Sequence, residues 1–178
     1  MNDFRLQPFA IDSNLPDIEI VGTIDRDGRN ILSIAYQLQG DLTAVAIESP
    51  NPAPSRQFEL WEATCFEFFI GIPGHANYWE FNLSPTGNWN VFALNNYRQG
   101  LRDEIAFTSL PIAIARSANS LLLSSTINLS KIISATQSLE MSVTTVIKSS
   151  QHELSYWALT HPGTAADFHS RDSFILNI

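Results

Sequence analysis

The feature that most constrains the fold is a series of short runs in which apolar and polar residues alternate, separated by turn residues at spacings of about 8–12 residues. Such alternation is typical of β-strands with one buried face. No segment keeps an apolar period of 3.6 residues over three turns, so no long helix is expected. The pattern predicts an all-β protein, an antiparallel β-sandwich of jelly-roll type with about a dozen strands. The predicted strands cover residues 4–9, 18–24, 31–38, 42–47, 64–72, 78–84, 88–95, 105–107, 112–116, 121–129, 139–148, 152–159 and 174–178.

Turn residues mark the connections between these runs. Asp25–Gly28 ends in the Asp-Gly pair typical of β-hairpins, and Ser84–Asn88 combines proline and glycine in a second tight turn. Three prolines within residues 49–56 predict a long loop without a regular hydrogen-bond ladder. Ser130 is placed to cap a turn over residues 131–135, which is the one short helical turn that we expect.

The chain of 178 residues is long enough for a single domain, residues 1–178, with a full core. A domain of this length buries roughly 70% of its unfolded surface, so it needs no metal or disulfide for stability. Cys65 is the only cysteine, which excludes an intramolecular disulfide. The formal net charge of −8 argues against nucleic acid or an anionic membrane as a partner.

The sequence shows no targeting pattern. Its first residues lack a basic start followed by an apolar core, the pattern of a signal peptide. No apolar run approaches the roughly 20 residues needed to span a bilayer. We therefore expect a soluble cytoplasmic protein, and the sequence does not indicate its oligomeric state.

Residues 60–102 hold three of the four tryptophans, the only cysteine and three glutamates within apolar runs. Side chains of a strand alternate between its faces, so Glu67 shares a face with Cys65 and Phe69. The next predicted strand has two faces: Trp79, Phe81 and Leu83 on one, and Tyr78, Glu80, Asn82 and Ser84 on the other. The first of these two sets is typical of a core face.

If the two strands pair, Glu67, Glu80 and Asn82 share a surface with Tyr78. Aromatic rings stack on the C–H face of a sugar, while carboxylates and amides bind its hydroxyl groups. This surface therefore suits carbohydrate. The alternatives that the residues leave open are a solvent-facing polar row over a core, or an ion pair of one of the two glutamates with Arg98 or Arg102.

Paired glutamates also raise the hypothesis of a hydrolase. Acid–base hydrolysis of a glycosidic bond uses two carboxyl groups about 5–10 Å apart across a cleft. Glu67 and Glu80, with Arg98 and His161 near them, could supply such a surface. No catalytic motif flanks these residues, so a non-catalytic protein is the stronger prediction.

A second group of polar residues lies near the end of the chain. The spacing H-x5-D-x-H from His161 to His169 contains metal-ligand residue types, which Cys65 or His75 could complete, but it matches no standard zinc signature. Acidic residues and backbone oxygens in a long loop would suit Ca²⁺. Cys65 lies in mid-strand between bulky apolar residues, which favours an inert core thiol over a nucleophile.

Two motifs resemble a known family. W-E-A-T-C-F-E-F-F-I-G at 61–71 and Y-W-E-F-N-L-S-P-T-G-N-W at 78–89 are similar to the DOMON-like group that is related to family nine carbohydrate-binding modules. A-L-T-H-P at 158–162, followed by D-F-H at 167–169, extends the resemblance. It implies a β-sandwich binding module, not a catalyst.

Family nine modules hold a sugar between two tryptophans and carry structural Ca²⁺, so the resemblance makes Ca²⁺ a candidate ion here. Haem, which other DOMON domains bind through Met and His, would depend on Met141, a residue of an alternating strand. The resemblance gives as ring candidates Trp61, Trp79, Trp89 and Trp157.

Pattern and resemblance together predict a carbohydrate-binding module. The alternative is a cytoplasmic structural or protein-interaction β-sandwich that retains no sugar site. The predicted ligand-binding residues are Glu67, Tyr78, Glu80, Asn82, Trp89, Arg98, Trp157, His161 and His169.

Overall fold

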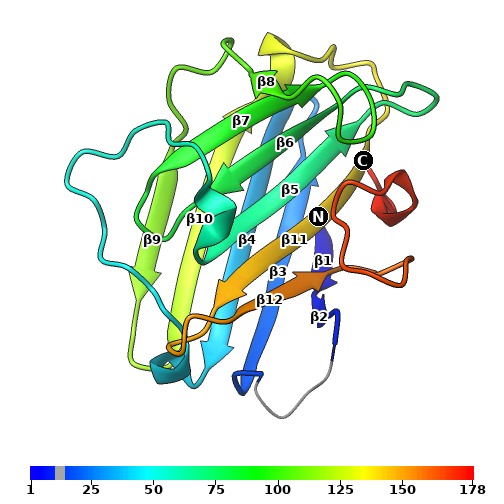
Figure 1. The fold of residues 1–178 in the computed structure, drawn as a ribbon. Helices are drawn as coiled ribbons and strands as arrows, with labels where there is room; N and C mark the ends of the chain where they lie inside the picture. The colour runs from blue at the N-terminus through cyan, green and yellow to red at the C-terminus, as the bar shows by residue number, and fades with distance from the viewer. Residues whose placement is uncertain (11–14) are drawn as a thin grey trace.

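The computed structural model describes residues 1–10 and 15–178, and it shows two antiparallel β-sheets packed face to face (Figure 1). The smaller sheet has five strands in the order β1-β3-β4-β10-β9. They are β1 (Asn2–Arg5), β3 (Ile18–Arg26), β4 (Ile31–Gly40), β9 (Ile112–Arg116) and β10 (Ser120–Asn128). Alternate residues of β4 and β10 are buried, as the period of two predicts.

The larger sheet lies in front of the smaller one in Figure 1 and has the order β2-β12-β11-β5-β6-β7-β8, with β13 added beside β11. Its strands are β2 (Gln7–Pro8), β5 (Cys65–Gly71), β6 (Tyr78–Leu83), β7 (Trp89–Leu94), β8 (Arg102–Asp103), β11 (Glu140–Lys148), β12 (Leu154–Ala158) and β13 (Leu176–Asn177). The predicted antiparallel all-β sandwich is confirmed.

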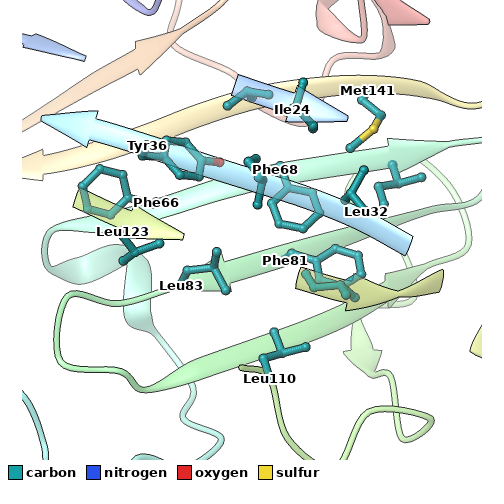
Figure 2. Packing of buried hydrophobic residues seen from close by; sticks show 14 of the residues in the cluster. Ile24, Leu32, Tyr36, Phe66, Phe68, Phe81, Leu83, Leu110, Leu123 and Met141 are labelled. Atoms are coloured by element: carbon teal, nitrogen blue, oxygen red, sulfur yellow. The ribbon is translucent and has the colours of Figure 1, made fainter. Parts of the chain in front are cut away.

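The main core fills the space between the two sheets (Figure 2). Phe68 of β5 stacks on Phe81 of β6 with ring centroids 4.5 Å apart. Tyr36 reaches across from the smaller sheet, and its hydroxyl donates a hydrogen bond of 2.6 Å to the backbone carbonyl oxygen of Glu67. Trp79 lies in this core, as its position in the strand predicts.

A second, smaller core covers the outer face of the larger sheet. Every residue of β5, β6 and β7 is buried, so these strands are covered on both faces. The cover comes from the turn around Trp61 and from the C-terminal segment that follows β12. The second core consists of Phe69, Tyr78, Phe92, Leu94, Val146, Ala158, Phe168 and Phe174, with Trp61 packed against it.

Two predicted strands are wrong. Residues 42–47 form a single 3-10 turn, η1 (Leu42–Ala44), and then one isolated bridge from Val45 to Ser149. Residues 105–107 form a turn instead of a strand, and Ile105 is 84% exposed because it points away from both cores.

Helical structure in the described residues consists of four single 3-10 turns, more than the one turn expected. Besides η1 they are η2 (Leu60–Glu62), η3 (Leu129–Lys131) and η4 (Arg171–Ser173). The predicted helical turn corresponds to η3, which lies earlier in the chain because Asn128, not Ser130, is its cap: the side-chain oxygen of Asn128 accepts the N–H of Ser130. Within the described ranges, no helix is long and apolar enough to cross a membrane.

Candidate functional site

A cleft of about 580 Å³ opens on the outer face of the larger sheet. Its floor is formed by β5, β6, β7 and β11, and its walls come from η2, the loop after β7, β12 and the C-terminal segment. The residues that line it are Trp61, Glu62, Glu67, Phe69, Glu80, Leu94, Arg98, Leu101, Val146, Leu154, Tyr156, Ala166, Phe168 and His169.

Strand register places the two glutamates of the floor beside each other. Glu67 of β5 is directly opposite Asn82 of β6, and Glu80 is two residues from Asn82 on the same face. The glutamates are therefore diagonal neighbours, a separation that side chains of this length can bridge. Glu67 is 3% exposed and Glu80 is 5% exposed, so both carboxyl groups lie at the bottom of the cleft. We call Glu67 and Glu80 the carboxyl pair.

Glu67 carries an unsatisfied oxygen. Its Oε1 is buried and has no hydrogen-bond partner among the described residues, and the same holds for the hydroxyl of Thr144, which is opposite Glu67 on β11. Burial raises the pKa of Glu67 well above its usual value, and repulsion by Glu80 raises it further. Burial thus favours the protonated form of Glu67, and its Oε1 retains hydrogen-bonding capacity beside the cleft.

Glu80 is better satisfied. Its Oε1 accepts a hydrogen bond of 2.8 Å from the Asn82 amide. Burial raises the pKa of Glu80 to about 7, even though the Asn82 hydrogen bond and the nearby charge of Arg98 favour the ionised form. Its Oε2 lies 3.9 Å from Nε2 of His169, beyond hydrogen-bond distance. Burial, with a contribution from Arg98, lowers the pKa of His169 to about 4, so the imidazole is neutral at neutral pH and forms no ion pair with Glu80.

Tyr78 orients the imidazole of His169. The Tyr78 hydroxyl oxygen accepts the backbone N–H of Arg98 at 3.2 Å and lies 2.9 Å from Nδ1 of His169. Because the hydroxyl accepts from Arg98, its own proton is free to be donated to Nδ1. In that arrangement the imidazole proton sits on Nε2, the atom that faces Glu80.

Asp167 holds the wall of the cleft in place. Its carboxylate accepts hydrogen bonds from the hydroxyl of Tyr97 at 2.8 Å, from the guanidinium of Arg98 at 2.9 Å and from the backbone N–H of His169 at 3.1 Å. Partial burial raises the pKa of Asp167, but the hydrogen bonds from Tyr97, Arg98 and His169 outweigh it, and the net pKa is lowered. The loop after β7 and the C-terminal segment are thereby joined across one end of the cleft.

Aromatic rings stand on the other sides of the cleft. Trp61 is half-buried and packs edge-on against Phe58, with ring centroids 5.3 Å apart. Tyr156 of β12 is exposed and packs edge-on against Phe168 at 5.9 Å. Two partly open rings therefore border the buried carboxyl pair, a combination of stacking surface and polar groups.

The structure brings together six of the nine predicted binding residues. Glu67, Glu80, Arg98 and His169 line the cleft, and two others contact them directly. Tyr78 contacts His169, and Asn82 contacts Glu80.

The other three predicted residues do not line the cleft. Trp89 lies in the main core with the guanidinium of Arg56 4.5 Å above its ring, because β7 turns this residue inward. Trp157 also lies in the main core, because it is the inward neighbour of Tyr156 on β12. The Nε2–H of His161 donates to the backbone carbonyl of Gln7 at 2.9 Å, at the β2 edge of the sheet.

Other residues of the site were not in the predicted set. Trp61 was a ring candidate only through the resemblance, and η2 brings it over the outer face of the sheet. Tyr156 could have been found because alternate residues of β12 point to the outer face of the sheet. Phe168 could have been found as the apolar residue between Asp167 and His169. Leu101 and Leu154 are exposed leucines of the cleft for which the sequence pattern offers no signal.

The metal, haem and nucleophile hypotheses can be compared with the positions of the described residues. The described residues contain no group of three or more His, Cys, Asp and Glu side chains that could hold a metal ion. Ca²⁺ bound with backbone oxygens stays a prediction. Met141 is fully buried in the main core, where it packs as an apolar side chain. Burial raises the pKa of the Cys65 thiol well above its usual value, which does not suit a nucleophile.

Two solved structures are similar to this chain over most of its length. One, described as a "putative carbohydrate-binding protein" from Bacteroides uniformis ATCC 8492, is 16% identical with a TM-score of 0.63, covering 96% of this chain and 84% of its own. The other is a family nine carbohydrate-binding module from Caldicellulosiruptor kristjanssonii in complex with cellotriose; it is 10% identical with a TM-score of 0.54, covering 92% of this chain and 74% of its own.

This chain shares its fold with both proteins. At these identities the similarity concerns the fold alone, and it does not test the resemblance to DOMON-like proteins. No protein-family model and none of the curated proteins compared with the chain matches it.

Proposed function

We propose that the protein binds carbohydrate, without cleaving it, in the cleft on the outer face of the larger sheet. The observation that carries this proposal is the position of the buried carboxyl pair between the partly open rings of Trp61 and Tyr156. The rings offer stacking surfaces for a sugar, and the unsatisfied Oε1 of Glu67 offers a partner for its hydroxyl groups. The fold shared with a module solved in complex with cellotriose supports the proposal.

Binding is favoured over hydrolysis by the placement of the two carboxyl groups. Glycosidases place their two carboxyl groups on opposite sides of the scissile bond. Glu67 and Glu80 instead lie side by side on adjacent strands of one floor. A sugar above them meets both carboxyl groups from the same side.

Titration calorimetry with glucose, cellobiose and cellotriose tests the proposal directly. Trp61 is the one tryptophan of the four that is not buried, so its fluorescence should respond to a bound sugar. We expect Trp61→Ala to weaken binding by about 5- to 30-fold, since loss of one stacked ring costs about 1–2 kcal/mol. Leu122→Ala, an exposed apolar residue on the smaller sheet, is the control and should leave binding unchanged.

Two results would contradict the proposal. If none of the three sugars binds to the wild-type protein, the cleft does not serve carbohydrate. If cellotriose is converted to shorter sugars during prolonged incubation, and Glu67→Gln abolishes the conversion, the protein is a hydrolase rather than a binding module.

A further inference from the structure

Acidic residues outnumber basic residues in the lining of the cleft. Three acidic residues line it, Glu62, Glu67 and Glu80, and its basic residue is Arg98. The guanidinium of Arg98 is already paired with Asp167 at 2.9 Å. The cleft described by these residues contains no lysine, and its histidine, His169, is neutral at neutral pH. When the carboxyl pair ionises, the residues that line the cleft therefore supply no full counter-charge.

The carboxyl pair also has acceptor atoms to spare. Oε1 of Glu67 is buried without a hydrogen-bond partner in the described part of the chain. Oε2 of Glu80 lies 3.9 Å from Nε2 of His169, which is beyond hydrogen-bond distance. Buried polar atoms are almost always partnered in folded proteins, so the unpartnered Oε1 of Glu67, next to Glu80 in the same cleft, points to a ligand that donates hydrogen bonds.

An ammonium group fits this arrangement better than a hydroxyl group does. An ammonium group has three donors and no acceptor, whereas a hydroxyl group has one donor. Its charge compensates the carboxyl pair, and hydrogen bonds between charged groups are about twice as strong as neutral ones. The rings of Trp61 and Tyr156 add a favourable surface for a cation. Sugars that carry a carboxylate or a phosphate are disfavoured by repulsion from Glu67 and Glu80.

We infer that the carboxyl pair, Glu67 and Glu80, is a subsite for a ligand ammonium group, so that the preferred ligand is an amino sugar with a free amine. The inference rests on the proposed function and names its substrate class. The amine approaches the floor of the cleft and donates to Oε1 of Glu67 and Oε2 of Glu80. The sugar ring lies above them against the aromatic walls.

Three sugars that share one ring test this inference by calorimetry at pH 6.5. Glucosamine carries the free amine, glucose lacks it, and N-acetylglucosamine carries it in a neutral acetylated form. We expect glucosamine to bind about tenfold more tightly than either of the others. If glucosamine binds no more tightly than glucose, the inference is wrong and the proposed function stands.

Proton release gives a second measurement on the wild-type protein. At pH 6.5 Glu80 is largely protonated. The titratable groups around the pair are Tyr36, Glu62, Cys65, Tyr78, Arg98, Tyr156, Asp167 and His169. An ammonium ion favours the ionised carboxylate, so binding of glucosamine should release protons, seen as heats that differ between two buffers. Binding of glucose should release none. Equal proton release for both sugars would overturn the inference.

Isosteric variants locate the subsite. Glu67→Gln and Glu80→Gln keep the shape of the floor, and each should reduce the ratio of glucosamine affinity to glucose affinity to about twofold or less, whatever its effect on glucose binding itself. Glu48→Gln, an exposed glutamate outside the cleft, is the matched control and should keep the full preference. An undiminished preference in both cleft variants would place the amine elsewhere and contradict the inference.

A pair of ligands that are not sugars separates the inference from the proposed function. Cyclohexylamine and cyclohexanol differ in the same way as glucosamine and glucose but lack the other hydroxyl groups. Binding of cyclohexylamine alone, with no binding of any sugar, would overturn the carbohydrate function and support the ammonium subsite. If neither sugars nor cyclohexylamine bind, both proposals fall.

Discussion

Two carboxyl groups at the bottom of a cleft are costly for this protein to keep. Burial disfavours the charged form of each, and Glu80 adds repulsion on Glu67. His169 bears the opposite cost, because burial disfavours its protonated form. At the scale of single residues, the site is therefore built from groups held near neutrality, ready to exchange protons with a ligand.

This charge balance predicts a pH dependence of stability. The pKa of Glu80 rises from 4.5 in the unfolded state to about 7 in the folded state, so the folded state binds more protons between these pH values. The contribution of Glu80 to the free energy of unfolding therefore falls as the pH rises from about 4.5 to 7. Glu80→Gln removes this loss. We expect its free energy of unfolding, relative to the wild type, to increase across that range by on the order of 3 kcal/mol.

Urea unfolding at a series of pH values measures the effect. His169→Gln should change the pH dependence in the opposite direction, because its lowered pKa makes His169 contribute stability that grows as pH rises from about 4 to 6.5. Parallel curves for the wild type and Glu80→Gln would show that this carboxyl group titrates normally.

At the scale of elements, alternation along strands predicted much of the site but not which face is open. The grouping of Tyr78, Glu80 and Asn82 against Trp79 was right, because a strand has only two faces. Trp157, one of the predicted binding residues, lies in the main core, and its outward neighbour Tyr156 lines the cleft. Both faces of β5, β6 and β7 are buried, so polarity alone could not separate a core face from a site face.

The covering segments were the least predictable part of the site. Trp61 reaches the cleft through the 3-10 turn η2, and the C-terminal wall reaches it through contacts far apart in sequence. Asp167 makes such contacts with Tyr97 and Arg98, which lie 70 and 69 residues earlier. A local pattern carries no information about such pairs, although it placed the strands between them.

The three hydrogen bonds to the Asp167 carboxylate, which we call the clamp, are therefore expected to decide how firmly the cleft wall is held. Asp167→Ala removes three hydrogen bonds, from Tyr97, Arg98 and the backbone of His169. Because Arg98 is about half exposed, we expect a loss of only about 1–2 kcal/mol in the free energy of unfolding. Hydrogen exchange of the backbone amides in residues 95–101 and 165–170 should become faster.

An exposed aspartate of the same segment supplies the control. Asp172→Ala alters η4 without touching the clamp and should leave exchange in residues 95–101 unchanged. Equal exchange rates in the wild type and Asp167→Ala would mean that the wall is held by the packing of Phe168 alone.

At the scale of the whole molecule, the two sheets and the cleft are connected through the main core. Tyr36 extends from β4 of the smaller sheet, and its hydroxyl donates to the backbone carbonyl of Glu67, whose side chain points to the opposite face into the cleft. The backbone of Glu67 is thus held from the core side of β5, while its side chain lies on the outer side. The smaller sheet supports the site without contributing a residue that lines it.

Tyr36→Phe tests this connection. The change keeps the ring in contact with Phe66 and Phe4 but leaves the Glu67 carbonyl oxygen without its 2.6 Å partner. We expect the free energy of unfolding to fall by about 0.5–1.5 kcal/mol, the net contribution of one intramolecular hydrogen bond. The affinity for the ligand should fall as well, because Glu67 is then held less firmly. For comparison, Phe68→Ala should lower the free energy of unfolding by about 3–5 kcal/mol, because it leaves a cavity in the core. A Tyr36→Phe protein with lower stability but unchanged affinity would show that β5 positions Glu67 through its own strand pairing with β6 and β11, and that the smaller sheet serves only the fold.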